Sequence, residues 1–75
     1  MSGEGLPVIS GAEAVKAFVK AGWTARSQAG SHISMTKPGV AVNLSVPQHK
    51  QLDRGLLRAL IRKSGLTVEQ FKALL

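Results

Sequence analysis

Apolar residues near the start of the chain recur at spacings of three and four, which places them on one face of a helix. These residues are Val15, Phe18 and Val19. Just before them, Ser10 and Glu13 have the spacing of a capping box, which satisfies two free backbone amides at a helix start. Gly22 provides a stop signal at the other end. The pattern predicts a helix over Gly11–Ala21.

From Trp23 onward the apolar period changes to two, which is the period of a strand with one buried face. Three strand-like segments follow, and turn residues separate them: Ala29-Gly30 after the first and Lys37-Pro38-Gly39 after the second. Pro47 ends the third segment, since proline has no backbone N–H for a sheet. The segments run from Trp23 to Arg26, from His32 to Thr36 and from Val40 to Val46. The sequence therefore predicts a three-stranded antiparallel meander.

In the second predicted strand, apolar and polar residues alternate. Ile33 and Met35 alternate with His32, Ser34 and Thr36. Neighbouring side chains on a strand point to opposite faces. A strand that turns its two apolar side chains toward the helices therefore turns the three polar ones toward the open face of the sheet. His32 is expected to be accessible to a ligand.

Two further helical segments follow the strands. Asp53 can cap the first, and Gly65 ends it. Thr67 and Gln70 repeat the capping-box spacing before the second, which is expected to reach the end of the chain. The apolar faces comprise Leu56, Leu57, Leu60 and Ile61 in the first segment and Val68, Phe71, Leu74 and Leu75 in the second. The element order predicts an α+β fold whose helices pack on one face of a three-stranded antiparallel sheet.

The chain has 75 residues, which is the size of one small domain. We expect residues 6–75 to form that domain, and residues 1–5 to be disordered or left over from expression. The absence of cysteine excludes disulfides, a thiolate nucleophile and a cysteine-built zinc site. The sequence has neither a signal-peptide pattern nor an apolar run long enough to span a bilayer, so we expect a cytoplasmic protein without membrane contact.

The chain is strongly basic. Ten Lys and Arg residues against four Asp and Glu give a formal net charge of +6 and a pI near 10.6. This balance indicates a polyanionic partner, of which nucleic acid is the commonest, although acidic proteins and anionic lipids would satisfy the same charge. Part of the charge forms a stripe on the predicted helix after the strands, namely Arg54, Arg58 and Arg62 with Lys50 and Lys63 beside it. This stripe has two interpretations, a binding site for phosphates or a solvent-exposed helix face without a ligand, and both would have the same sequence pattern.

Candidate chemistry is concentrated in Gly30-Ser31-His32, where an imidazole stands beside a hydroxyl and a glycine that allows close approach of a ligand. Histidine is suited to proton transfer near neutral pH, which phosphodiester cleavage through the ribose 2′-OH requires. A solvent-facing strand histidine without a role would give the same triplet. His49 is the other histidine, and it is either a second proton carrier or a surface loop residue. Two histidines without a carboxylate or cysteine at ligand spacing make a poor metal site, so we expect no metal and no cofactor.

Several short motifs occur in a characteristic order. They are Gly22-Trp23, Gln28-x-Gly30-Ser31-His32, Val46-Pro47-x-His49, Gly55-x-Leu57-x-x-x-Ile61 and Ser64-Gly65-Leu66-Thr67. With these motifs, over about Val8 to Leu75, the chain resembles the HicA (YcfA-like) toxins of toxin-antitoxin systems. The resemblance implies a fold like that of double-stranded-RNA-binding domains (dsRBD-like). It also implies an mRNA interferase that cleaves RNA without metal through His32 and is held inactive by a HicB-type antitoxin.

The sequence departs from the family pattern beside the histidine motif. Family members often carry an arginine where Ser27 stands, and here Arg26 lies one place earlier. Because a shift of one residue changes the face of a strand, Arg26 is not expected to replace that arginine. A basic residue that is frequent at the position of Ala29 is also missing, so RNA contacts around the turn are expected to be weaker.

Three functions are compatible with these observations. The first is a metal-independent endoribonuclease acting on single-stranded RNA, in which His32 is the general base or acid. In this hypothesis Gly30 and Ser31 shape the phosphate site, and the RNA is held by His49, Lys50, Arg54 and Arg58. The second is a non-catalytic RNA-binding module of the same fold. The third is a protein-interaction domain that meets an acidic partner.

Overall fold

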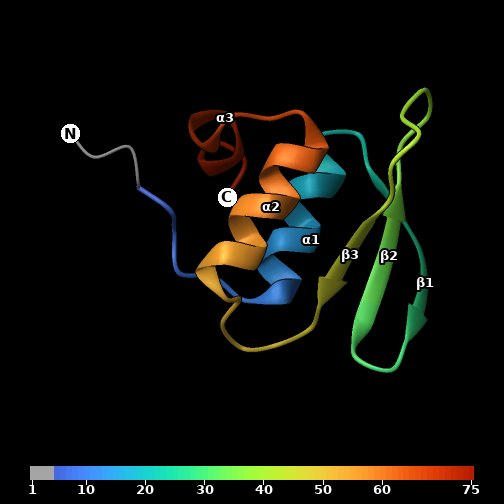
Figure 1. The fold of residues 1–75 in the computed structure, drawn as a ribbon, viewed down its shortest axis with the longest axis horizontal. Helices are drawn as coiled ribbons and strands as arrows, with labels where there is room; N and C mark the ends of the chain where they lie inside the picture. The colour runs from blue at the N-terminus through green and yellow to red at the C-terminus, as the bar shows by residue number, and fades with distance from the viewer. Residues whose placement is uncertain (1–4) are drawn as a thin grey trace.

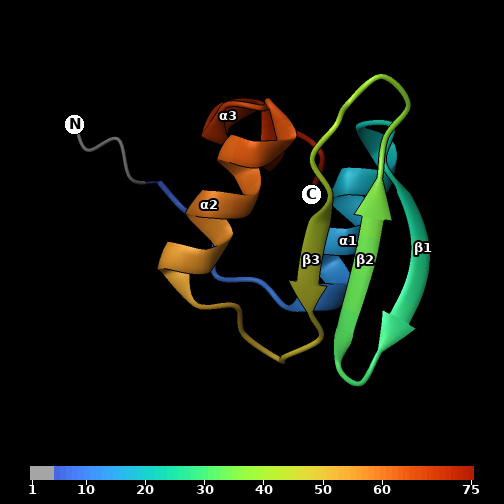
Figure 2. The same ribbon diagram turned by 45° about the vertical axis from the view of Figure 1, so that its right-hand side comes forward.

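The computed structural model describes residues 5–75 and contains the expected elements in the expected order. They are α1 (Gly11–Lys20), β1 (Thr24–Ala29), β2 (His32–Thr36), β3 (Leu44–Pro47), α2 (Arg54–Ser64) and α3 (Val68–Lys72). The helices lie on one side of the sheet, and none of the helices within residues 5–75 covers its other face (Figures 1 and 2). The predicted α+β fold is confirmed. The expectation for residues 1–5 falls, except for Gly5, outside the described residues.

The helices begin where the capping signals predict. Ser10 and Glu13 form both hydrogen bonds of a capping box at α1, and Thr67 and Gln70 do the same at α3. A carboxylate oxygen of Asp53 accepts a hydrogen bond from the Leu56 amide at 3.1 Å, which caps α2. These interactions satisfy backbone amides at the helix starts that no backbone carbonyl within the helix can reach. Local sequence therefore sets the start of each helix.

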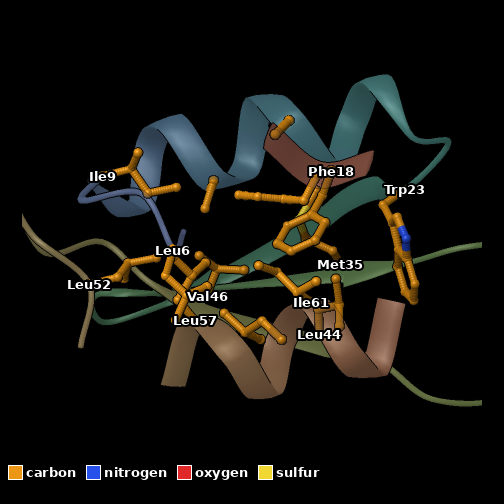
Figure 3. Close-up of a cluster of buried hydrophobic side chains, with 14 residues drawn as sticks. Leu6, Ile9, Phe18, Trp23, Met35, Leu44, Val46, Leu52, Leu57 and Ile61 are labelled. Carbon is orange, nitrogen blue, oxygen red and sulfur yellow. The ribbon is translucent and has the colours of Figure 1, made fainter. Parts of the chain in front are cut away.

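The core lies between the helices and the sheet (Figure 3). Phe18 of α1 and Phe71 of α3 are fully buried, with ring centroids 5.0 Å apart and planes tilted by 46°. The other large side chains with almost no exposure are Trp23, Met35, Leu44, Val46 and Leu57. The helical spacing predicted Val19 on the buried face of α1, and this prediction is wrong. Val19 is 49% exposed, whereas Ala14 and Ala17 face the core. Every element except β1 thus contributes buried side chains to one hydrophobic layer on the helix side of the sheet.

The strands form an antiparallel sheet in the order β1-β2-β3. The pairing of β1 with β2 shifts between Ala25 and Ser27, which leaves Arg26 as an extra residue in a β-bulge. The assumption of strict alternation around Arg26 is therefore wrong. β1 is also an edge strand whose residues are all exposed, and it begins at Thr24 rather than at Trp23.

The third strand is shorter than the sequence predicts. It was expected from Val40, but it begins at Leu44, and Val40 and Val42 are 36% and 44% exposed. Met35 pairs with Leu44, so earlier residues would have to pair with the turn that follows β2. That turn contains proline and closes on itself by a hydrogen bond from the Val40 amide to the Lys37 carbonyl at 3.1 Å. The alternating valines have no strand to pair with.

The last helix is also shorter than predicted, because it ends at Lys72 instead of reaching the end of the chain. Of its apolar stripe only Phe71 is fully buried, and Leu75 is 49% exposed. Burial of Phe71 holds the short α3 against the core. The residues after Lys72 have no comparable burial that would extend the helix.

Candidate functional site

His32 is the first residue of β2 and is exposed on the open face of the sheet. Its Cα partners are Ala29 on β1 and Pro47 on β3. Along the strand Ile33 is half-buried and Met35 is fully buried, so alternation turns the His32 side chain away from the core, as the sequence predicted. A backbone held on both sides thus carries a side chain that is free to meet a ligand.

The turn before His32 has the conformation its residues favour. Gly30 has a φ of 61°, and Ser31 does not adopt a positive φ, which matches a type II′ hairpin turn. The side-chain amide of Gln28 donates a hydrogen bond to the Gly30 carbonyl at 3.1 Å. A Cβ atom on Gly30 would meet nothing within 4 Å, so the backbone conformation, and not crowding, requires glycine. Open space therefore lies beside the turn.

The loop between β3 and α2 is tied to this turn. The Gln48 amide donates a hydrogen bond to the Ser31 carbonyl, which brings His49 and Lys50 to the same end of the molecule as His32. The other side of the loop is fixed to the start of α1, because the Gly11 amide donates to the His49 carbonyl at 2.9 Å. The side chains of His49 and Lys50 are exposed. The structure thus places both histidines at the same end of the molecule, a relation that the sequence left open.

Gly11 supports this loop in a way that the sequence did not reveal. It is the first residue of α1 and is buried. A Cβ atom there would lie 2.0 Å from the carbonyl oxygen of Pro47 and 2.9 Å from the Cα of Gln48, both of them backbone atoms. Only glycine lets α1 approach the end of β3 this closely. The sequence shows a glycine after a capping serine, and nothing in it indicates this contact.

The basic residues of α2 extend away from the histidines. Arg54 begins the helix, four residues after Lys50, and Arg58 follows one turn later. All three are exposed. Arg62 lies near the other end of α2, where it and Arg58 line a shallow hollow of about 250 Å³ beside the start of α3. The predicted stripe is present, but only its first part is near the histidine end.

The starts of two helices and the exposed side chains of Lys50 and Arg54 lie at that end of the molecule. The β1–β2 turn, the end of β3 and the start of α2 all lie at the lower edge of Figure 1, and α1 also begins there. Helix starts carry partial positive charge. Two carboxylates at this end, Glu13 and Asp53, accept hydrogen bonds from backbone amides at the helix starts. The arrangement suits an anion next to His32 and Lys50.

Residues 5–75 contain neither a metal-binding cluster nor a membrane-spanning helix. No group of three or more His, Asp, Glu or Cys residues in this range is placed to hold a metal ion. No helix in the same range is long and apolar enough to cross a membrane.

Comparison with known proteins identifies the family. The family model for the HicA toxin of bacterial toxin-antitoxin systems matches residues 11–66 of the 75-residue chain. This segment runs from the start of α1 to just after α2 and contains both histidines. A search of curated proteins gave no match. The chain belongs to the HicA toxin family of bacterial toxin-antitoxin systems.

Proposed function

We propose that this toxin is a metal-independent endoribonuclease that cleaves messenger RNA in the cytoplasm with His32 as its catalytic residue. The observation that carries the proposal is the placement of His32. Its side chain is exposed at the end of a rigid strand, beside a glycine turn and next to a loop that bears His49 and Lys50. This combines a proton carrier with positive charge where a phosphate would lie.

The proposed reaction is attack of a ribose 2′-oxygen on the adjacent phosphorus. A base takes the 2′-OH proton as the new O–P bond forms, and an acid gives a proton to the 5′-oxygen as the P–O5′ bond breaks. The products are a 2′,3′-cyclic phosphate and a 5′-OH end. His32 performs one of these transfers, and His49, the other histidine of the chain, is the candidate for the second. Gly30 and Ser31 leave room for the phosphate, and Lys50 with Arg54 and Arg58 holds the neighbouring backbone.

The antitoxin partner is part of the same proposal. Membership of a toxin-antitoxin family implies an antitoxin, and we propose that it is a HicB-type protein which covers the open face of the sheet and His32. Acidic side chains on it would complement the basic residues at the start of α2. Such a complex would exclude RNA from the histidine.

The proposed activity is tested by incubating the purified toxin with a long single-stranded RNA in EDTA. We expect cleavage to continue in the chelator, with cyclic-phosphate ends on the products. Retardation of the RNA without products would instead support the non-catalytic RNA-binding module. Activity that EDTA abolishes and a divalent cation restores would contradict the proposal.

The basic residues near the histidines are expected to contribute to RNA binding in a salt-dependent way. Each phosphate contact of a single strand contributes about 0.7 to the slope of log K against log salt concentration. Replacing Arg54 or Arg58 with glutamine in His32→Ala protein should therefore lower the slope by roughly that amount. Fluorescence anisotropy of a labelled RNA at several salt concentrations measures it.

Arg62→Gln is the matched control for this experiment. Arg62 lies eight residues after Arg54 on the same helix, or about 12 Å further along it. We expect it to leave the slope unchanged. An equal effect at Arg62 would indicate diffuse attraction to the whole basic helix and would contradict a defined contact near His32.

A further inference from the structure

Three serines lie side by side across the three strands of the sheet. Ser34 of β2 has Ser27 of β1 as its Cα partner on one side and Ser45 of β3 on the other. We call these three residues the serine row. Ser45 is exposed between two buried neighbours, so alternation places the row on the open face of the sheet. His32 lies on the same face, two residues before Ser34.

The bulge in β1 places Ser27 in this row. Ala25 lies opposite the buried Met35, and under strict alternation Ser27 would share the face of Ala25. The extra residue Arg26 shifts the alternation by one, so Ser27 lies opposite Ser34 instead. Bulges are frequent beside active sites, where they redirect a side chain. Arg26 is itself exposed and adds positive charge next to the row.

The hydroxyl groups of the serine row do not hold the fold together. The side-chain hydrogen bonds within the described residues involve the helix caps and a few other polar side chains, and none involves the row. Each hydroxyl is thus available as a donor and an acceptor. The row has no aromatic side chain on which a base could stack, and it lacks the apolar centre of a typical protein interface. A polar, backbone-like ligand fits it best.

We propose that the serine row binds the ribose-phosphate backbone of the RNA strand that reaches His32, an inference that rests on the function proposed above. Hydroxyl side chains commonly donate hydrogen bonds to phosphates and sugars, and a 2′-OH can both donate and accept. Ser34 and His32 are two residues apart along β2, or about 7 Å, and the row spans about 10 Å across the sheet. These lengths are short enough for one RNA strand to contact both the row and His32.

The test compares valine with threonine at the same positions. The Ser34→Val/Ser45→Val and Ser34→Thr/Ser45→Thr proteins have added side chains of the same shape, and both residue types favour strands, so the pair isolates the hydroxyls. Both are made in His32→Ala protein, and binding of a short single-stranded RNA is measured by fluorescence anisotropy. We expect the valine protein to bind about three- to tenfold more weakly for each hydroxyl lost.

The outcomes separate this inference from the proposed function. Thr24→Val, at the far end of β1, should leave RNA binding unchanged. Equal affinities of the valine and threonine proteins would overturn the role of the serine row. In protein that retains His32, the valine pair should raise KM more than it lowers kcat. EDTA-resistant cleavage that depends on His32, together with equal affinities, would refute the serine row and leave the proposed function standing.

Discussion

Replacing His32 with alanine is expected to abolish growth arrest in bacteria and to lower the rate of RNA cleavage by about 10²- to 10⁴-fold, the usual contribution of a general acid or base. The imidazole is exposed and no side-chain hydrogen bond to it is found among the described residues, so its removal should leave the fold intact. Single-turnover cleavage of a defined RNA measures the rate, and thermal unfolding checks the fold.

Two companion variants sharpen this result. His32→Gln keeps a polar side chain that cannot exchange protons near neutral pH, so it should be as inactive as His32→Ala. His49→Ala identifies the second proton carrier: a comparable fall in kcat would assign that role to His49, whereas a rise in KM alone would make it a binding residue. Undiminished toxicity and cleavage in both His32 variants would refute the catalytic role of His32.

Replacing Gly11 with alanine is expected to destabilise the protein by about 1–3 kcal/mol or more, as overpacking of a filled site does. The new Cβ would lie 2.0 Å from the carbonyl oxygen of Pro47, so α1 and the loop that carries His49 must move apart. For a domain of this size each kcal/mol lowers Tm by roughly 4–8 °C. Calorimetry or circular dichroism measures the loss of stability, and the cleavage assay should show reduced activity at temperatures where the variant is still folded.

Gly55→Ala is the matched control. Gly55 is an exposed residue in the first turn of α2, where a Cβ atom would meet only the side-chain oxygen of Asp53 at 3.2 Å. That carboxylate can shift, and alanine favours a helix, so the change in stability should be less than about 1 kcal/mol. If Gly11→Ala were as mild as Gly55→Ala, close packing of α1 against the end of β3 would not be a requirement of this fold.

The sequence was a good guide to the helices because their signals are local. A capping box involves residues three apart. Likewise Gly65, in the αL conformation, ends α2 and donates a backbone hydrogen bond to Arg62, three residues before it. Apolar periodicity was a less reliable guide for residues at the border of the hydrophobic core. Val19 has the right spacing for the buried face of α1, but its side chain is 49% exposed.

The strands show where local patterns fail. Val40 and Val42 continue the alternation of β3, yet a strand needs a partner, and the register of β2 leaves them opposite a turn. The bulge at Arg26 could not be predicted from the sequence either, because an extra residue in one strand is defined only by its pairing with the neighbouring strand. The position of Ser27 opposite Ser34, and with it the serine row, could therefore not be predicted from the sequence.

By itself, the sequence determined the element order, the helix caps, the accessibility of His32 and the family. Each of these depends on residues that are close together in the chain or on motifs in a fixed order. Tertiary structure alone decided which distant groups meet: His49 beside the turn of His32, Gly11 against Pro47, and Ser27 in line with Ser34 and Ser45. The physical reason is that these contacts depend on strand register and on how closely one backbone approaches another, and neither is set by the residues next to them in the chain.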